Sequence, residues 1–277
     1  FLLILITNFS FAQSENYKIA YEAYSGGDSE TALEYFEKDL NENPNSAYSH
    51  FYLSVLYVIQ EKLDLAENHI DKALVNFPES STTMRSKAYS VKGDIAYKLK
   101  NTVNTFKYYA LAIQLRPKEI DLYLDRGQYY FELGQLDKAE AEFKHILTID
   151  VSNIYAYGGL GRNYLKEKRY DLAEKNLTKA IQLNDLYYVA LQLRAQTYFE
   201  QKKYKEAILD IVEVISIEPD DSDSRDQFLT YSLNDYELAL TEPTFKFPQI
   251  WRTNVAIDHR LPGGIIATAE FLYNKDV

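Results

Sequence analysis

A period of about 34 residues organises most of this sequence. Six small residues mark it: Ala32, Ala66, Thr105, Ala139, Ala173 and Ala207. Four of the five intervals between these marker positions are equal, and the interval between the second and the third is five positions longer. A period of roughly 20–50 residues is typical of proteins in which similar units stack, because no single unit can bury its apolar surface alone. The period therefore predicts a repeat architecture.

Each marker position begins a helical pattern in the second half of its unit. A large residue follows four positions later, at Phe36, Ile70, Tyr109, Phe143, Leu177 and Ile211. A further member follows three positions after that, at Asp39, Ala73, Ala112, Ile146, Ala180 and Val214. The i, i+4, i+7 spacing places all three on one face of a helix, so we expect them in the core. Proline, which ends helices, stands twelve positions after the marker in four units, and Val151 and Asp185 stand there in the others.

A first helix is predicted in the first half of each unit. Twelve positions before the marker stands Ala20, Ser54, Gly93, Gly127, Gly161 or Ala195. Glycine inside a helix costs about 1 kcal/mol relative to alanine, so its presence indicates close approach of a neighbouring helix. The single longer interval places its extra residues near residues 80–87, where we expect a longer loop or a helix extension.

A helix–turn–helix unit with this period and this pattern resembles the tetratricopeptide repeat. The resemblance covers six units over residues 13–220. It implies an all-α fold, a right-handed superhelix (α-solenoid) of six repeats whose inner surface is lined by the first helices. It also implies protein or peptide binding on that surface. The sequence departs from the repeat pattern where Asp39, Thr105 and Ile146 replace the usual alanine.

Helical phase predicts which residues of the first helices face the inner surface. The candidates are Tyr17, Tyr21, Tyr24, Phe51, Val55, Val58, Asp94, Tyr97, Gln128, Phe131, Arg162, Gln196 and Phe199. The predicted groove is apolar at its N-terminal end and more polar beyond. Some members of the family hold a peptide's terminal carboxylate with lysines and asparagines, but at the matching places here Arg162 is the lone cation. The alternative is that the aromatic residues only pack between helices.

Residues 1–12 are predicted to be a truncated secretory signal peptide. The run is uncharged and mostly apolar, and small residues at Ser10 and Ala12 precede the expected cleavage site. It is too short to span a bilayer, which needs about 20 apolar residues. A buried N-terminal strand or helix is the alternative. Export implies a periplasmic or outer-membrane-associated location in a Gram-negative bacterium.

The C-terminal segments follow a different pattern. Residues 221–240 are predicted to be a capping helix or linker. In residues 241–277 the period changes to two, and a turn at Pro262-Gly263-Gly264 separates two alternating stretches, which predicts a β-hairpin. Residues from about 235 to 277 resemble a barrel segment of TonB-dependent outer-membrane receptors of the Bacteroidetes type. The resemblance implies a receptor fragment or a fusion artefact, and a hairpin packed on the solenoid is the alternative.

Charge and residue content exclude several classes of function. A net charge of -11 argues against nucleic acid as the main partner, and the absence of cysteine excludes disulfides and thiolate metal sites. The four histidines, His50, His69, His145 and His259, have no metal-motif spacing. No glycine-rich phosphate loop or nucleophile elbow is present, so we predict neither catalysis nor a cofactor.

The sequence thus predicts an exported, non-enzymatic scaffold that binds a protein or peptide in the bacterial envelope. The competing hypothesis is a component of an outer-membrane receptor or transport system whose barrel begins in the tail.

Overall fold

The structure is a computed structural model of the chain. It describes residues 14–218, 222–224, 226–228, 230–232, 255–260 and 266–271. The predicted signal peptide lies outside the described residues.

Twelve helices form six consecutive pairs between residues 15 and 217. The first helices of the pairs are α1 (Glu15–Ser25), α3 (Ala47–Ile59), α5 (Thr82–Lys98), α7 (Ile120–Glu132), α9 (Ile154–Lys166) and α11 (Tyr188–Glu200). The second helices are α2 (Ser29–Glu42), α4 (Leu63–Asn76), α6 (Thr102–Leu115), α8 (Leu136–Ile149), α10 (Tyr170–Leu183) and α12 (Tyr204–Ile217). Each pair is one repeat, which confirms the predicted solenoid. The extra residues of the third unit lengthen α5, which has 17 residues against 13 in α3.

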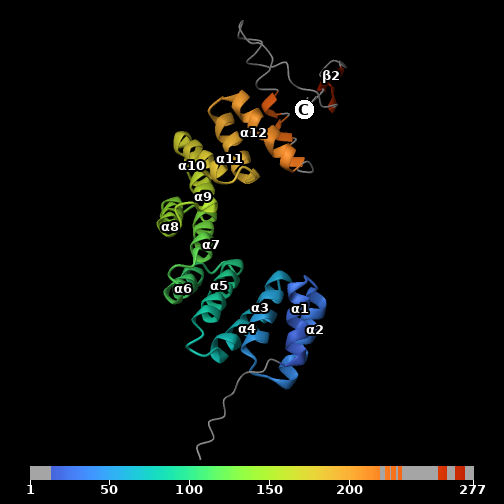
Figure 1. Cartoon of the computed structure of the whole chain (residues 1–277), viewed down its shortest axis with the longest axis vertical. Coiled ribbons are helices and arrows are strands. Elements are labelled where there is room, and N and C mark those ends of the chain that lie inside the picture. Colours follow the sequence, from blue (N-terminus) through green and yellow to red (C-terminus); the bar gives the residue numbers. More distant parts are fainter. Residues whose placement is uncertain are drawn as a thin grey trace, which may run out of the picture.

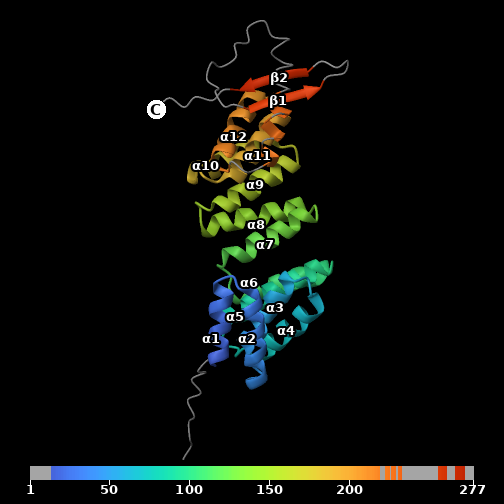
Figure 2. The same cartoon turned by 90° about the vertical axis from the view of Figure 1, so that its right-hand side faces the viewer.

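The repeats stack in sequence order, with α1 and α2 at one end and α11 and α12 at the other (Figures 1 and 2). In Figure 1 the stack describes an arc. Helices α7, α9 and α11 lie on the inner side of this arc, while α6, α8 and α10 lie on the outer side. The first helices of the later repeats therefore line the inner surface, as the family resemblance implies.

The predicted core positions are buried. All six marker residues are 0% exposed, and the large residues four positions later are at most 2% exposed. The glycines of the first helices face these large side chains. A Cβ atom at Gly93 or Gly127 would stand 2.7 Å or 2.9 Å from the side chain of Tyr109 or Phe143, and one at Gly161 would stand still closer to Leu177. The small residue is thus required by close packing within each helix pair.

The departures at Asp39 and Thr105 have local partners. The buried carboxylate of Asp39 accepts hydrogen bonds from the hydroxyls of Ser14 and Ser49 and, at 3.1 Å, from the amide of Asn43. Although burial opposes the shift, these hydrogen bonds lower the pKa of Asp39. Thr105 donates its hydroxyl to the carbonyl oxygen of Asn101 at 3.0 Å, within its own helix turn. Polar groups are accepted at these core positions because they are hydrogen-bonded.

The turns inside the repeats share one backbone conformation. The second residue after each first helix has a positive φ, at Gly27, Glu61, Lys100, Gly134, Lys168 and Lys202. The left-handed conformation ends the first helix and directs the chain into the second. Four of these residues are not glycine, with φ between 58° and 62°. The turn is therefore set by its position in the repeat rather than by glycine.

A helical segment follows the sixth repeat, where the sequence predicts a capping helix or linker. Residues 222–224, 226–228 and 230–232 are helical. The ring of Tyr231 stacks on Phe199 of α11 with a centroid distance of 4.5 Å, and the amide of Gln192 donates to the hydroxyl of Ser224 at 3.0 Å. This segment covers the end of the stack.

Two strands are described in the predicted tail. Strand β1 (Val255–Arg260) pairs antiparallel with β2 (Ile266–Phe271), with Val255 opposite Phe271 and Arg260 opposite Ile266. The other residues of the predicted hairpin tail lie outside the described part of the chain, so the resemblance to a receptor barrel stays a prediction. Within the described ranges, none of the helices has the length and apolar character needed to span a bilayer.

Candidate functional site

The N-terminal end of the inner surface is an aromatic cluster. Tyr17 is 6% exposed and Phe51 is 7% exposed, so both belong to the packing between helices and not to a free groove surface. This corrects their prediction as groove residues. The rings of Tyr17 and Phe36 pack in an edge-to-face arrangement, with centroids 5.8 Å apart. The rings of Phe51 and Phe77 pack in the same way, with centroids 6.5 Å apart. Helical phase within the first helices alone did not show that residues of other elements cover these rings.

The outer layer of this cluster is accessible. Tyr21 is 44% exposed and stacks on Tyr17, with ring centroids 6.1 Å apart. The half-buried Tyr24 contacts Tyr52 at 4.9 Å, and Tyr21 contacts the same ring at 5.5 Å. The partly buried Val55 packs against the cluster. Tyr52 contacts Tyr17, Tyr21 and Tyr24, yet helical phase missed it because it lies one position from the predicted stripe.

The middle of the inner surface is acidic and rich in tyrosine. The carboxylate of Asp94 accepts hydrogen bonds from Tyr109 at 2.5 Å and from Tyr129 at 2.8 Å. The Tyr97 ring lies 4.0 Å from that of Tyr129, and its hydroxyl donates to Glu132. These contacts join the third and fourth repeats. The helical pattern did not indicate Tyr129, which follows the candidate Gln128 directly in the sequence.

Burial raises the pKa of two carboxyl groups in this region, those of Asp94 and Asp125. It raises the pKa of Asp94, against the opposing hydrogen bonds from the two tyrosines. Burial, together with the charges of Asp94 and Asp121, raises the pKa of Asp125 to about 6. Asp125 is therefore mostly ionised at neutral pH, and the middle of the inner surface carries negative charge.

A pocket of about 260 Å³ lies across three first helices at the C-terminal half of the inner surface. We call it the inner pocket. Its lining comes from α7, α8, α9 and α11 and the residue before α11: Leu124, Asp125, Gln128, Phe143, Tyr155, Gly158, Gly159, Arg162, Tyr187, Val189 and Leu193. Gly158 and Gly159 are among the lining residues; a Cβ on Gly158 would stand 2.8 Å from the hydroxyl of Tyr187, and one on Gly159 would stand 2.7 Å from the ring of Phe143. The two glycines thus allow the rings of Tyr187 and Phe143 to pack against the backbone of α9 beside the pocket.

Arg162 is the cation of the inner pocket. Its Nη2 donates to the side-chain oxygen of Gln128, and its guanidinium carbon lies 4.3 Å from the centroid of the Phe131 ring. The Nε atom is buried without a hydrogen-bond partner. Burial lowers the pKa of Arg162. Among the described residues, its direct partners are thus an amide and a ring rather than a carboxylate.

The remaining candidates have separate places. Gln196 is exposed on α11. Phe199 stacks on Tyr231 and belongs to the covered end of the stack. The structure therefore brings together Gln128, Phe131 and Arg162 in one place, and Tyr17, Tyr21, Tyr24, Phe51 and Val55 in another. It does not bring these two groups together.

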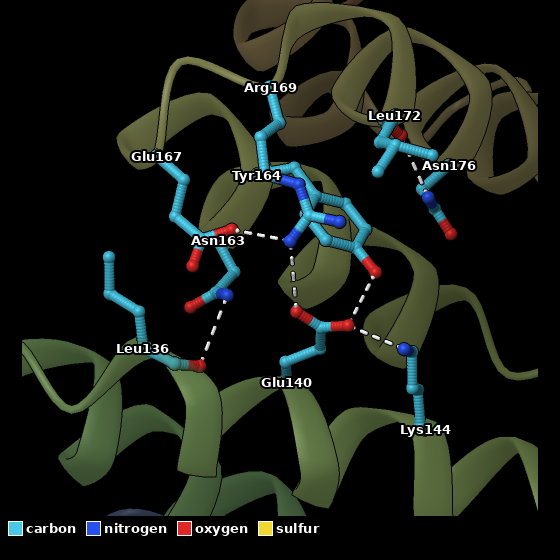
Figure 3. A network of polar contacts seen from close by, with 9 residues as sticks. All are labelled: Leu136, Glu140, Lys144, Asn163, Tyr164, Glu167, Arg169, Leu172 and Asn176. Atoms are coloured by element: carbon cyan, nitrogen blue, oxygen red, sulfur yellow. Dashed lines mark hydrogen bonds and ion pairs between the residues drawn. The ribbon is translucent and has the colours of Figure 1, made fainter.

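The outer side of the stack carries polar joints between repeats. The carboxylate of Glu140 on α8 accepts hydrogen bonds from Tyr164 at 2.9 Å, Lys144 at 2.5 Å and Arg169 at 3.5 Å (Figure 3). One repeat later, Glu174 accepts from Tyr198 at 3.5 Å and from Lys203 at 3.0 Å. One repeat earlier, Phe106 and Tyr130 stack at 4.0 Å in the equivalent place.

A broader depression of about 830 Å³ lies over α10. Glu174 and Lys203, which line this depression, form an ion pair with each other. Lys175, Lys179 and Asp171 line it as well. Its charged groups are solvated or paired. We therefore place the candidate site in the inner pocket, where the Nε of Arg162 is buried without a hydrogen-bond partner.

Two histidines meet between α3 and α4. Their Nδ1 atoms, in His50 and His69, are 3.0 Å apart, and the Nε2 of His50 lies 3.1 Å from the carbonyl oxygen of Pro44. The sequence spacing of 19 residues gave no sign of this pair. In the described part of the chain no three His, Cys, Asp or Glu side chains are grouped as metal ligands.

Comparison with known proteins identifies similar repeats. A family model described as tetratricopeptide repeat matches residues 17–81 and 159–222, and a second model of the same description matches residues 120–152. The chain is 28% identical over 203 residues to a TPR repeat-containing protein, MJ1428, of Methanocaldococcus jannaschii. The match covers 69% of this chain and 34% of that protein, so the chain spans about a third of this relative.

Solved structures share the fold. The C-terminal part of a TPR repeat-containing protein from Cytophaga hutchinsonii superposes with a TM-score of 0.67 at 19% identity, over 82% of this chain and 89% of that chain. The protein YrrB, described as a TPR protein with an unusual peptide-binding site, superposes with a TM-score of 0.51 at 19% identity. That match covers 74% of this chain and 100% of YrrB. At these identities the likeness shows the fold alone.

Proposed function

Because this chain belongs to the tetratricopeptide repeat family, we propose that it is a non-enzymatic scaffold that binds a protein or peptide segment in the groove formed by its inner surface. The observation that carries the proposal is the inner pocket. It is concave, it draws its lining from three successive first helices, and it combines apolar walls with an arginine whose buried Nε has no hydrogen-bond partner. Such a combination of apolar surface and few polar groups is typical of binding sites.

The chemistry of the groove supports binding rather than catalysis. Leu124, Val189 and Leu193 offer apolar contact, and Gln128 and Arg162 offer hydrogen-bond donors. Tyrosine rings with polar tips, such as Tyr155 and Tyr187 here, are frequent anchors in protein interfaces. A binding role also agrees with the description of YrrB, whose fold this chain shares.

A curved stack also suits an extended ligand. The polar joints on the outer side hold adjacent repeats together, and the first helices then present their side chains in one row. A partner segment lying in the groove would meet the acidic middle region and the inner pocket in turn. Its affinity would come from a few anchors, with the remaining contacts excluding water.

We further propose that the protein works in the bacterial envelope. Support comes from the apolar run of residues 1–12 and the small residues Ser10 and Ala12 before the expected cleavage site. The receptor alternative rests on the tail sequence alone. Mass spectrometry of the N-terminus of the protein recovered from its native cells tests export: a mature chain beginning at Gln13 in the periplasmic fraction is expected, and a cytosolic chain that still carries residues 1–12 would contradict it.

Selection of peptides on the full chain tests the binding function. A random peptide library displayed on phage should yield enriched binders that compete with one another for one site. The variant Val189→Arg places a long charged side chain at the rim of the inner pocket and should abolish their binding. The matched control is Val151→Arg, because Val151 is 71% exposed in the loop before α9 and does not line the pocket. Absence of any enriched peptide, or equal binding by both variants, would contradict the proposal.

A further inference from the structure

We propose that the N-terminal end of the inner surface binds a proline-rich segment in the polyproline II conformation, flanked by lysine or arginine. The residues that carry this inference are Tyr21, Tyr24, Tyr48 and Tyr52, and we call them the tyrosine face. The inference rests on the proposed function, since it names a partner chemistry for the same inner surface. It concerns a different place from the inner pocket, so the two can be tested separately.

The tyrosine face joins rings from two neighbouring first helices. Tyr21 is 44% exposed and Tyr48 is 38% exposed, while Tyr24 and Tyr52 are half-buried. The ring of Tyr52 on α3 lies 5.5 Å from that of Tyr21 and 4.9 Å from that of Tyr24, both on α1. The buried Tyr17 stacks on Tyr21 and meets Tyr48 edge to face, with centroids 6.1 Å apart in each contact. Packed rings thus hold the face in place while its outer rings stay open to solvent.

The polar groups of the tyrosine face are hydroxyls, which can donate hydrogen bonds. Those of Tyr17, Tyr21 and Tyr52 interact with one another. In the part of the chain that the structure describes, the hydroxyls of Tyr24 and Tyr48 have no hydrogen-bond partner. A polyproline II segment has no internal hydrogen bonds, so its carbonyl groups can accept from such hydroxyls, whereas most carbonyls of an α-helix are already bonded within the helix. The face therefore matches an extended segment better than a helical one.

The rings of the tyrosine face give a second reason for proline. Proline-rich segments are bound by surfaces lined with aromatic rings, and they are already extended before binding, so little conformational entropy is lost. On α3, Val55 and Val58 are partly buried and pack against the same cluster. The sequence of α3, from Ala47 to Ile59, contains no Asp, Glu, Lys or Arg. An uncharged surface thus continues beside the rings.

Charge indicates what flanks the prolines. Residues 15–42, which form the first repeat, contain eight acidic residues and two lysines. Glu15 and Glu22 on α1 are exposed, and Lys18 between them pairs with Glu15 at 3.3 Å. Lysine or arginine beside the prolines would therefore be attracted to this repeat, and acidic residues would be repelled.

The first test measures the binding of three fluorescein-labelled peptides to the full chain by fluorescence anisotropy. One has about ten prolines between arginines, a length of about 30 Å in the polyproline II form. The second keeps the arginines and replaces the prolines by alternating glycine and serine, and the third is an amphipathic helix of the same charge. The proline peptide should bind at least about tenfold more tightly than either control. Equal or tighter binding of a control peptide would overturn the inference.

The second test locates the proline peptide on the tyrosine face. Tyr21→Ala should weaken its binding at least about tenfold, and Tyr21→Phe, which removes only the hydroxyl, should weaken it about two- to tenfold. Tyr155→Ala is the matched control, because Tyr155 is 55% exposed on α9 and is not part of the face. It should leave the affinity unchanged. Equal affinities of Tyr21→Ala and Tyr155→Ala would overturn the inference, and Tyr21→Phe decides the matter where Tyr21→Ala lowers the melting temperature.

The flanking charges are tested with the same proline core. Glutamates in place of the arginines should weaken binding, since the acidic first repeat would repel them. Unchanged or tighter binding would overturn the assignment of basic flanks.

Val189→Arg distinguishes this inference from the proposed function. It obstructs the inner pocket and should leave the binding of the proline peptide unchanged, because Val189 lies on α11. If Val189→Arg abolishes that binding and Tyr21→Ala does not, the inference is overturned while the proposed function stands. No binding of the proline peptide, together with enriched peptides from the display library, has the same meaning. Failure to enrich any peptide would instead count against the proposed function.

Discussion

The hydroxyl of Tyr164 donates a hydrogen bond of 2.9 Å to the carboxylate of Glu140, across the boundary between the fourth and fifth repeats. Lys144 and Arg169 donate to the same carboxylate, as Figure 3 shows. Although burial opposes the shift, these partners lower the pKa of Glu140. The contact recurs one repeat later between Tyr198 and Glu174. The stack thus reuses one polar joint to fix the position of neighbouring repeats.

Removing the Tyr164 hydroxyl should therefore weaken the stack. Tyr164→Phe should lower the free energy of unfolding by about 1–2 kcal/mol, because a buried hydroxyl bonded to a charged acceptor is lost while the ring remains. Urea denaturation followed by circular dichroism measures this. Tyr155→Phe is the control, since Tyr155 is 55% exposed and its hydroxyl is not part of the joint. An equal effect of both changes would show that the joint contributes nothing.

The repeat register can be tested at Ala173. This residue is 0% exposed where α10 packs on its neighbours, so Ala173→Arg would bury a long charged side chain. We expect a loss of several kcal/mol, a large part of the roughly 5–15 kcal/mol of a typical domain. Gln182→Arg adds the same group at an exposed position of α10 and should leave the melting curve nearly unchanged. An unaltered melting curve for Ala173→Arg would mean that the register is wrong.

The His50–His69 pair should make stability depend on pH. Burial, together with the nearby charges of His50 and Lys72, lowers the pKa of His69 from 6.5 to about 4. Between pH 6.5 and about 4, His69 is protonated in the unfolded chain but neutral in the folded chain. The contribution of the neutral pair to the free energy of unfolding is therefore complete above pH 6.5 and is lost as the pH falls toward about 4.

Urea denaturation at about pH 7 and about pH 5 measures this dependence. Between these values the free energy of unfolding should fall by about 1–2 kcal/mol more for wild type than for His69→Gln. Wild type and His69→Gln carry the same carboxyl groups, so the effect of these groups on stability cancels when the two pH profiles are compared. Parallel pH profiles would contradict the role of the pair.

Truncation separates the capping segment from the tail. A chain ending at Leu240 keeps the stacking of Tyr231 on Phe199 and should melt like the full chain. A chain ending at Glu218 exposes the apolar end of the sixth repeat and should melt at a lower temperature and associate more readily. If the chain ending at Leu240 also unfolds early, residues beyond 240 are integral to the solenoid.

Much of the fold was predictable from the sequence because repeat packing is local and periodic. The small position of each first helix faces the partner helix, so only a small residue is accepted there, as the contact of Gly161 with Leu177 illustrates. Four of the six turns have a left-handed residue that is not glycine, such as Lys168 and Lys202, so glycine gave no signal there.

The candidate site was predictable only in part. Helical phase assigned Gln128 and Arg162 to one surface, and both line the inner pocket, because phase determines direction within one helix. It could not show that Tyr17 and Phe51 are buried, since their cover comes from other elements: Tyr17 contacts Phe36 of α2, and Phe51 contacts Phe77 after α4. Nor could it show that Gly158 and Gly159 line a pocket, because a pocket depends on the spacing of three helices.

Hydrogen–deuterium exchange of the full chain, with and without a selected peptide, tests the central proposal most directly. Binding in the groove should slow exchange in α7, α9 and α11, because ligand contacts oppose the local opening of these helices. Exchange in the outer helices α8 and α10 should change little by comparison. Slower exchange confined to α8 and α10, or no change in α9, would contradict a ligand held on the inner surface.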